Sequence, residues 1–457
     1  MAPASSLPVP VTRDLESIVG PEHVLLADEL RAGYEVDWTG RFRGRSLAVV
    51  RPASAEEVAA VVARCAVSGI PIVAQGGNTG LVGGGVPRNG EVVLSMRRLA
   101  DVGRPDVGGR SIEADAGATL TAVSAAASAA RLEVPIDLAS RDGATIGGMI
   151  ATDAGGIHSL AYGRMRDHVI GLDAVGADGG LMRDADAALI AGSEGTLAII
   201  TRARLRLIPR LTGRAVALVG LGSIDEALEL VGHLRQTLPS LVAAELMLAD
   251  GLDLVTDHLG VPPPFTRTPP SAVLLECRAA TDPLEALAAA LEGAPEAAEI
   301  LVGTDAPDRR RLWTLREAHP EAIAMLGVPH KMDVTVPDTV LATFLERLPS
   351  TASAASPGAR VILFGHVGVA DYHVNVVGPP LDDEAADEAV LRLVAELGGD
   401  VAGEHGAGIA KARWLALTRS EGELRAIAAR KASFDPKGLL NPGVIPAARI
   451  APLLSGG

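Results

Sequence analysis

The sequence predicts an α+β protein of more than one domain, and three observations support this prediction. The chain has 457 residues, which is more than one ordinary hydrophobic core accommodates. In its first half, short apolar strands alternate with amphipathic helices and glycine-dense loops, and in its second half longer strand-like runs alternate with helices. Apolar residues form 48% of the chain and charged residues 21%, a composition typical of folded proteins rather than disordered ones.

The first half is predicted to begin with an arm and a short helix in residues 1–45. The strand at 46–50 precedes a helix, because Ser54 and Glu57 form a capping-box pair and Gly69 supplies a stop. The next strand, at 70–74, leads into a glycine loop. Further strands are predicted at 91–95, 111–115, 169–177 and 197–208, with a helix at 119–130 and a domain boundary at Pro209.

The second half suits a smaller α+β domain with an antiparallel sheet. Its proline- and threonine-rich segment 262–272 is predicted to be a loop. Strands are predicted at 215–221, 273–277, 299–302, 331–336, 360–364 and 373–377, and helices at 224–236, 283–291, 338–347 and 383–397.

Charge and hydropathy exclude several partners. The 41 basic and 56 acidic residues give a net charge of −15, which repels phosphate backbones and argues against nucleic acid as a partner. No apolar run approaches the roughly 20 residues of a spanning helix, so we expect a protein that is not transmembrane. The opening residues lack the basic and apolar regions of a secretion signal, and two cysteines, Cys65 and Cys277, suit a reducing compartment. The expected location is therefore cytoplasmic.

Three glycine-dense segments follow strands in the first half. Residues 75–85 could turn several backbone N–H groups toward one anion, although their spacing matches neither the Rossmann nor the Walker pattern. Residues 144–156 and 192–197 offer two more tight backbone surfaces. A glycine-rich turn is the alternative for each segment alone, whereas three in one half of the chain favour a large dinucleotide.

Two segments near the end of the chain combine histidine with glutamate. His366 and His373 are separated by a gap that a loop and a strand could bridge, and Glu404 lies in a glycine-framed Glu-His pair with His405. Two imidazoles and a carboxylate would suit zinc or manganese with positions left open for substrate. The alternative is that both histidines are buried and hydrogen-bonded. If Glu404 binds the metal, His405 is left as a candidate general base.

Two positive side chains could bind a carboxylate. Arg316 offers a planar fork, and Lys331 adds a second charge. The alternatives are a solvated arginine on a helix and a lysine at a strand end in solvent. Asn441 is the one residue of the turn at 434–443 that turn chemistry leaves unexplained.

Taken in order, these segments resemble the flavin-dependent D-2-hydroxyacid dehydrogenases, a family that includes D-2-hydroxyglutarate and flavin-type D-lactate dehydrogenases and the catalytic subunit of glycolate oxidase. The resemblance runs from about Leu47 to Ile445. It implies the vanillyl-alcohol-oxidase fold, with a two-subdomain FAD-binding domain of the PCMH type and an α+β substrate (cap) domain containing an antiparallel sheet. The implied domains are an arm at 1–45, the FAD-binding domain at 46–210, the cap at 211–399 and a returning C-terminal segment at 400–457.

The resemblance also implies which residues contact FAD. No histidine or cysteine lies in the 75–85 loop, so the flavin is expected to bind non-covalently. The expected cofactor residues are Gln75, Gly76, Gly77, Asn78, Thr79, Gly80 and Leu81 at the pyrophosphate; Thr145, Gly147, Gly148, Thr152, Gly155 and Gly156 in a second wall; Gly192 and Glu194 near adenine and ribose; Asn441 at the flavin; and Ile200.

The implied reaction is metal-assisted hydride transfer from a D-2-hydroxy acid to the flavin, which yields the 2-oxo acid. His366, His373 and Glu404 match the ligands of a divalent metal, which is expected to be zinc, and His405 matches the base. Arg316, Lys331 and Asn375 match groups that hold the carboxylate and hydroxyl ends of the substrate. The expected partners are the 2-hydroxy acid, an electron acceptor (an electron-transfer protein, a quinone or oxygen) and a second copy in a homodimer.

Some positions depart from the family pattern and leave other readings open. Val369, Ala370 and Asp371 replace an Asp-Gly-Asn, Met149 and Asp153 replace asparagines, and the 179–191 connection is short. One alternative is a divergent flavoprotein with a non-redox, alkyl-transfer-like role, although the histidine-rich run expected for it is absent. The other is an inactive partner subunit.

Overall fold

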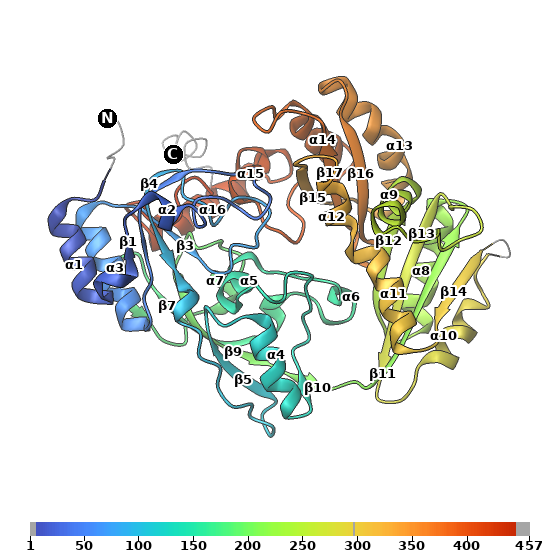
Figure 1. Cartoon of the computed structure of the whole chain (residues 1–457), viewed down its shortest axis with the longest axis horizontal. Helices are drawn as coiled ribbons and strands as arrows, with labels where there is room; N and C mark the ends of the chain where they lie inside the picture. Colours follow the sequence, from blue (N-terminus) through green and yellow to red (C-terminus); the bar gives the residue numbers. More distant parts are fainter. Residues whose placement is uncertain (1–5, 296–297, 445–457) are drawn as a thin grey trace. The chain divides into compact units, whose positions relative to one another are not determined.

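The computed structural model describes residues 6–295 and 298–444, which form two compact units (Figure 1). Unit 1 contains the residues up to 154, residues 164–209 and the residues from 405 on, and unit 2 contains residues 155–163 and 210–404. The sequence placed its boundaries after residues 45, 210 and 399, and it did not anticipate that 155–163 would belong to unit 2. Residues 1–5 and 445–457, the ends of the predicted arm and C-terminal segment, lie outside the description.

Unit 1 contains a first sheet in the strand order β1-β2-β4-β3. β2, β4 and β3 are parallel, while β1 is antiparallel to β2. Ser54 caps the helix α3 by accepting the Glu57 N–H, and Gly69 ends it in the left-handed conformation, so the predicted stop and start are both present. The elements are α1 (Val9–Val19), β1 (Val24–Leu25), α2 (Asp28–Arg31), β2 (Arg45–Val50), α3 (Ala55–Ser68), β3 (Ile72–Gln75) and β4 (Asn89–Ser95).

A second, antiparallel sheet of unit 1 has the order β5-β9-β7-β8. One hydrophobic core joins both sheets, since side chains of β4, such as Val92, and of β9, such as Ala203, belong to the same cluster. The elements are β5 (Ser111–Asp115), α4 (Leu120–Ala129), β6 (Leu132–Glu133), α5 (Ile146–Thr152), β7 (Val169–Val175), β8 (Leu181–Met182), α7 (Ala187–Ile190), β9 (Ile199–Arg206), β10 (Ile208–Pro209), α15 (Gly408–Lys411) and α16 (Glu421–Phe434).

Unit 2 is built on a seven-stranded sheet in the order β14-β11-β13-β12-β16-β17-β15, in which every neighbouring pair is antiparallel. This confirms the antiparallel sheet and the α+β class. The strands are β11 (Gly213–Leu221), β12 (Leu241–Leu248), β13 (Ser271–Ala279), β14 (Glu299–Gly303), β15 (His330–Thr335), β16 (Arg360–His366) and β17 (Asp371–Val377).

Helices pack against this sheet in two groups. α9, α11 and α12 contact one another, and α8, α13 and α14 form a second connected set (Figure 1). Residues 215–221 of β11 are all buried, as expected of a strand covered on both faces. The helices are α6 (Ser159–Tyr162), α8 (Ile224–Thr237), α9 (Ala249–Leu259), α10 (Leu284–Leu291), α11 (Ala306–Glu317), α12 (His319–Ala324), α13 (Asp338–Ala355) and α14 (Ala385–Glu396).

Five elements of unit 2 were not predicted from the sequence: the short α6, β12, α9, α11 and α12. The β12 segment is rich in alanine, leucine and methionine and contains Glu245, so its local preference is helical. It is a strand because β13 and β16 pair with it on both sides, and Glu245 is buried because charged partners meet it there. Helix α13 also continues beyond the predicted end, through Pro349. No helix in the part of the chain that the structure describes is long and apolar enough to cross a membrane.

Candidate active site

The register of unit 2 gathers the predicted site residues on one face of the sheet. His366 pairs across strands with Glu245 on one side and Asp371 on the other. His373 pairs with Phe364 and Asp333. Because directly paired residues in a sheet point to the same face, these side chains lie together although up to 128 positions separate them in the sequence, Glu245 to His373.

His366 is held from one side by a buried carboxylate. Its Nδ1 lies 2.6 Å from Oε1 of Glu245, whose other oxygen accepts from Nε of Arg316 at 2.7 Å. Glu245 is 1% exposed, so its charge requires these partners. Burial opposes ionisation of Glu245, but the charges of His366 and Arg316 lower its pKa below the usual value.

The other nitrogen of His366 faces Glu404. Nε2 of His366 lies 3.3 Å from Oε1 of Glu404, and Nε2 of His373 lies 3.9 Å from the same oxygen. Nδ1 of His373 is in turn 2.9 Å from Oδ1 of Asp333. Both imidazoles thus have Nδ1 against a carboxylate and Nε2 turned toward Glu404, and their ring centroids are 5.0 Å apart.

This donor set fits a divalent metal. A histidine that binds a metal through one ring nitrogen usually has its second ring nitrogen held by a carboxylate. Asp333, His373 and Glu404 can each also offer a ligand atom within 4.8 Å of the others. With no cation present, burial opposes protonation of His366, but the charges of Glu245 and Glu404 raise its pKa well above the usual value. A cation held by His366 and Glu404 would take the place of that proton.

Lys331 lies on the same face of the sheet. It pairs with Asn375 across β15 and β17, and its Nζ donates to Oδ1 of Asn375 at 3.1 Å. The Asn375 amide nitrogen donates to the carbonyls of His373 and Ile362. Burial lowers the pKa of Lys331 to about 8. The side chain of Asn375 is therefore engaged within the protein, where it orients Lys331.

Arg316 reaches the site from α11. Its guanidinium lies 4.4 Å from the centroid of the Phe364 ring, in a cation–π arrangement. His319, on the adjacent helix, packs against the same Phe364 ring, and the centroids of the two rings are 4.8 Å apart. Burial and the charge of Arg316 lower the pKa of His319 to about 3, so His319 stays neutral and adds no charge to the site.

In unit 1, the first two glycine segments pack against each other. A Cβ at Gly76 would lie 2.1 Å from Oγ1 of Thr145, and one at Gly77 would lie 1.7 Å from the carbonyl oxygen of Gly143. Only glycine allows this approach. Asn78 adopts a left-handed φ of 57°, and its amide donates to the carbonyl of Val36. The two segments thus form one continuous backbone surface.

The third glycine segment contacts the C-terminal part of unit 1. Glu194 accepts the N–H groups of Ala407 and Gly408, both at 2.8 Å, just after His405. Asn441 donates from its amide to the carbonyls of Gly84 and Glu194, at 2.9 and 2.7 Å. Glu194 therefore fixes the backbone that follows His405, and Asn441 ties the first loop to the third.

Unpartnered buried oxygens mark this region as fit for a polar ligand. Oδ1 of Asn441 and Oγ of Ser193 are buried and have no hydrogen-bond partner among the described residues. A buried polar atom without a partner costs about 1–3 kcal/mol. A bound group with N–H donors would remove this cost, and the isoalloxazine and adenine rings of FAD carry such donors.

The remaining predicted cofactor residues lie in several settings. Thr145 caps α5, and Thr152 donates to the carbonyl of Gly148 within that helix. Ile200 is a core residue of β9. Gly155 and Gly156 belong to unit 2, where the Gly156 N–H donates to Oε2 of Glu404 at 2.8 Å. The positions of Gln75, Gly147 and Gly192 are likewise set by contacts within unit 1.

Two site residues were missed by the sequence analysis, Glu245 and Asp333. Asp333 was detectable, because it alternates with Lys331 on a predicted strand and so shares its face. Glu245 lay in a segment for which no strand was predicted, and the signal, one carboxylate within an apolar run, is weak by itself.

Comparison with known proteins identifies the family. Residues 46–184 match the FAD binding domain family, and residues 210–445 match the family described as FAD linked oxidases, C-terminal domain. This chain belongs to the FAD linked oxidases. The cofactor of this FAD-linked oxidoreductase is FAD, as the sequence predicted.

Several relatives of this FAD-linked oxidase match it over most of their length. It is 36% identical over 433 residues to a protein of Xanthomonas citri pv. viticola named D-2-hydroxyglutarate dehydrogenase, with coverage of 90% of this chain and 91% of that one. A mitochondrial protein of the same name from Rattus norvegicus is 32% identical over 444 residues, with coverage of 92% and 82%.

Solved structures share the fold. P-cresol methylhydroxylase aligns with a TM-score of 0.78 at 14% identity, covering 97% of this chain and 98% of that one. Alkyldihydroxyacetonephosphate synthase aligns with a TM-score of 0.76 at 16% identity, covering 96% and 85%. These likenesses confirm the predicted vanillyl-alcohol-oxidase type of fold and say nothing of the substrate.

Proposed function

We propose that this FAD-linked enzyme oxidises a D-2-hydroxy acid to the 2-oxo acid, and that the substrate is a diacid of the D-2-hydroxyglutarate type. The observation that carries the proposal is the convergence of His366 and His373 on Glu404, with Lys331 and Arg316 on the same side of the sheet. The names of the relatives support the substrate class.

His366, His373 and Glu404 are proposed to hold a divalent cation, and zinc suits their mixture of nitrogen and oxygen donors. Asp333 keeps the His373 ring oriented, as Glu245 does for His366. A bound cation supplies electrophilic activation of the substrate's hydroxyl and of one carboxylate oxygen. The protein contributes the orientation of its imidazoles and a buried setting in which charge counts for more than in water.

His405 is proposed to be the general base that takes the proton of the substrate hydroxyl at a ring nitrogen. Two hydrogen bonds from the following residues to Glu194 would limit the movement of its backbone. FAD supplies the two-electron acceptor for the hydrogen on C2, and the residues of the three glycine segments would hold it without a covalent link.

The positive groups are proposed to select the substrate's charge. Lys331 is half-buried and pairs only with a neutral amide among the contacts described, so it suits a second carboxylate. Arg316 already balances Glu245, and its remaining N–H groups would contact a carboxylate oxygen. Asn375 acts as a positioning residue, through Lys331.

Anaerobic mixing with D-2-hydroxyglutarate, D-malate and D-lactate tests this proposal, with flavin bleaching as the readout. We expect faster bleaching by a diacid than by D-lactate. The ratio of the two bleaching rates should fall in Lys331→Ala. Faster bleaching by D-lactate, together with an unaffected Lys331→Ala variant, would contradict the charge argument. No bleaching by any of them would contradict the substrate class.

Four further expectations belong to this proposal. Acid precipitation should release the flavin into the supernatant, since no histidine or cysteine lies in the 75–85 loop. The two cysteines are free and buried, which supports a cytoplasmic location that fractionation would test. The electron acceptor is expected to be an electron-transfer protein, a quinone or oxygen, and the rates at which each reoxidises the reduced flavin would identify it. A homodimer is also expected, and light scattering would test it.

A further inference from the structure

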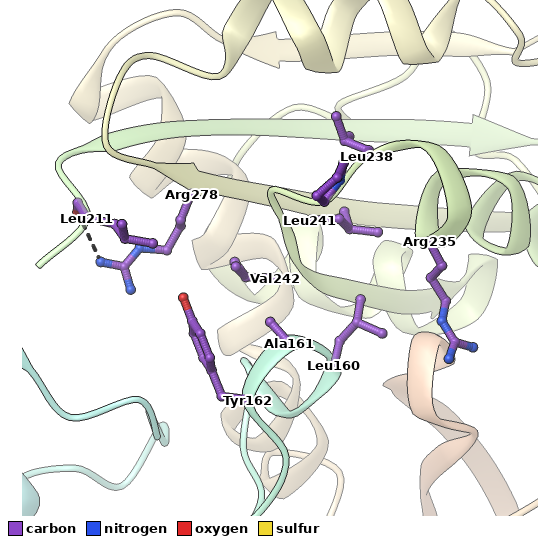
Figure 2. A pocket seen from close by; sticks show the side chains of 10 residues that line it. Leu160, Ala161, Tyr162, Leu211, Arg235, Leu238, Leu241, Val242 and Arg278 are labelled. Carbon is purple, nitrogen blue, oxygen red and sulfur yellow. Dashed lines mark hydrogen bonds between the residues drawn. The ribbon is translucent and has the colours of Figure 1, made fainter. Parts of the chain in front are cut away.

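Residues 155–163 belong to unit 2, although the chain on both sides of them belongs to unit 1. The helix within them, α6, has four residues and is too short to be stable by itself. Packing against the rest of unit 2 therefore holds the segment. α6 contacts β12 and a short turn, η4 (Val367–Val369), which directly follows β16, and Figure 2 shows Leu160 and Ala161 beside Val242 of β12.

Near its start, the segment holds one oxygen of Glu404. The N–H of Gly156 donates to Oε2 of Glu404 at 2.8 Å, whereas the Nε2 atoms of His366 and His373 face the other oxygen, Oε1. Glu404 is buried, so this charge-assisted hydrogen bond restricts which oxygen turns toward the imidazoles. Gly156 has a φ of 97°, a conformation that glycine adopts without strain.

Farther along, the segment packs against the turn after His366. A Cβ at Gly368 would lie 2.9 Å from Cδ1 and 3.1 Å from Cδ2 of Leu160, so the lack of a side chain at Gly368 makes room for Leu160. The φ of Gly368 lies outside the left-handed region, so space rather than backbone conformation favours glycine here. Gly368 is buried and lies two residues after His366.

Two of the three proposed ligands need such support because of where they lie. His366 is the last residue of β16, and Glu404 lies outside the helices and strands. His373, in contrast, lies inside β17, which pairs with β15 on one side and β16 on the other. Loop residues and strand ends are less restrained than the interior of a paired strand. The segment 155–163 thus contacts the protein at the two less restrained ligand positions.

We propose that residues 155–163 position the metal ligands, with Gly156 orienting Glu404 and Leu160 supporting the turn that follows His366. The inference rests on the proposed metal site, and it adds to that site a segment that supplies no ligand. Gly156 and Leu160 are positioning residues, and the property that they set is the affinity for the metal.

The contact between Leu160 and Gly368 offers the sharpest test. Gly368→Ala should displace Leu160 and weaken zinc binding roughly tenfold, the lower end of the range for groups that orient metal ligands. Leu160→Ala makes room for the added methyl group, so Leu160→Ala combined with Gly368→Ala should bind zinc more tightly than Gly368→Ala alone. Competition with a chromophoric chelator, with the FAD-loaded protein, measures the affinity.

Leu301→Ala is the matched control. It removes the same atoms from a half-buried leucine of β14, at the opposite edge of the sheet from β15. It should leave zinc affinity unchanged, while flavin spectra and thermal unfolding show whether each variant folds. A loss of zinc affinity in Leu301→Ala equal to that in Gly368→Ala, or no recovery in the double variant, would overturn the role of Leu160.

Hydrogen–deuterium exchange followed by mass spectrometry gives a second measurement. If the segment favours the metal-bound geometry, zinc must favour the ordered segment by the same factor, so zinc should slow amide exchange in residues 155–163. It should not do so in His373→Ala. Wild-type protein that binds zinc without slower exchange there, and with an affinity that Gly368→Ala leaves unchanged, would overturn this inference alone. Wild-type protein that binds no zinc would overturn the metal site itself.

Discussion

Nδ1 of His366 lies 2.6 Å from a carboxylate oxygen of Glu245, and these two residues are direct cross-strand partners in β12 and β16. The contact fixes which nitrogen of His366 turns toward Glu404. We therefore predict that Glu245→Gln lowers metal affinity and kcat/KM roughly 10- to 100-fold, the range usual for loss of a carboxylate behind a histidine ligand. Metal content after dialysis at graded metal concentrations and steady-state rates measure this effect.

The matched control is Glu276→Gln, which alters the other fully buried glutamate of this sheet. Glu276 accepts from Arg214 and from the indole of Trp313, both at 2.6 Å, and contacts none of the proposed metal ligands. Its loss should reduce the free energy of unfolding by about 1–3 kcal/mol while metal affinity stays the same. Equal loss of metal in both variants would show that Glu245 acts only through stability.

Removal of the metal should abolish turnover and leave the flavin in place. Treatment with a strong chelator, or His373→Ala, should give protein with an ordinary flavin spectrum and no bleaching by substrate, because the glycine segments belong to unit 1 except for residues 155 and 156, whereas His373 belongs to unit 2. Readdition of zinc or manganese should restore the chelated protein but not the variant. Full activity of metal-free wild-type protein would contradict the metal site.

Lys331 should make diacid recognition depend on pH. Burial lowers its pKa to about 8, so the side chain is charged below that pH and neutral above it. A bound carboxylate requires the charged form, so KM for the diacid should rise with pH above about 8 and stay flat below it. In Lys331→Met the KM should be high and lack this rise, and Lys331→Arg should retain low KM values to higher pH.

A 2-hydroxy acid without a second carboxylate is the control for this pH dependence. D-2-hydroxybutyrate should show no Lys331-dependent rise in KM. A rise that persists in Lys331→Met would assign the titration to another group.

Much of this site could be predicted because its residues belong to short segments with glycine, histidine and asparagine in fixed order. The strands bearing Lys331 and His373 were also predicted, since alternation and β-branched residues indicate them locally, whereas the strand predicted at 360–364 ended two residues before His366. Glu245 could not be found in this way, because β12 is a strand only through its pairing with β13 and β16. Likewise, only three-dimensional structure reveals that Glu194 binds the backbone after His405 rather than pointing to an open surface.

Asn441 tests the flavin site of unit 1. Its amide nitrogen donates to two carbonyl oxygens, while its Oδ1 has no hydrogen-bond partner within the described residues. Asn441 also has a left-handed φ of 41°, which asparagine and glycine tolerate better than other residues. Asn441→Gly therefore keeps the backbone conformation and removes the acceptor offered to FAD.

We predict that Asn441→Gly weakens FAD binding by roughly tenfold or more, because one hydrogen bond to the cofactor and the link between two loops are lost together. Thr201→Val is the control, since Oγ1 of Thr201 is another buried oxygen of unit 1 without a partner in the described chain and is not a predicted cofactor residue. Flavin fluorescence released on dilution measures the affinity. If Thr201→Val releases FAD as readily as Asn441→Gly, unit 1 is sensitive to any buried change, and Asn441 has no specific role at the flavin.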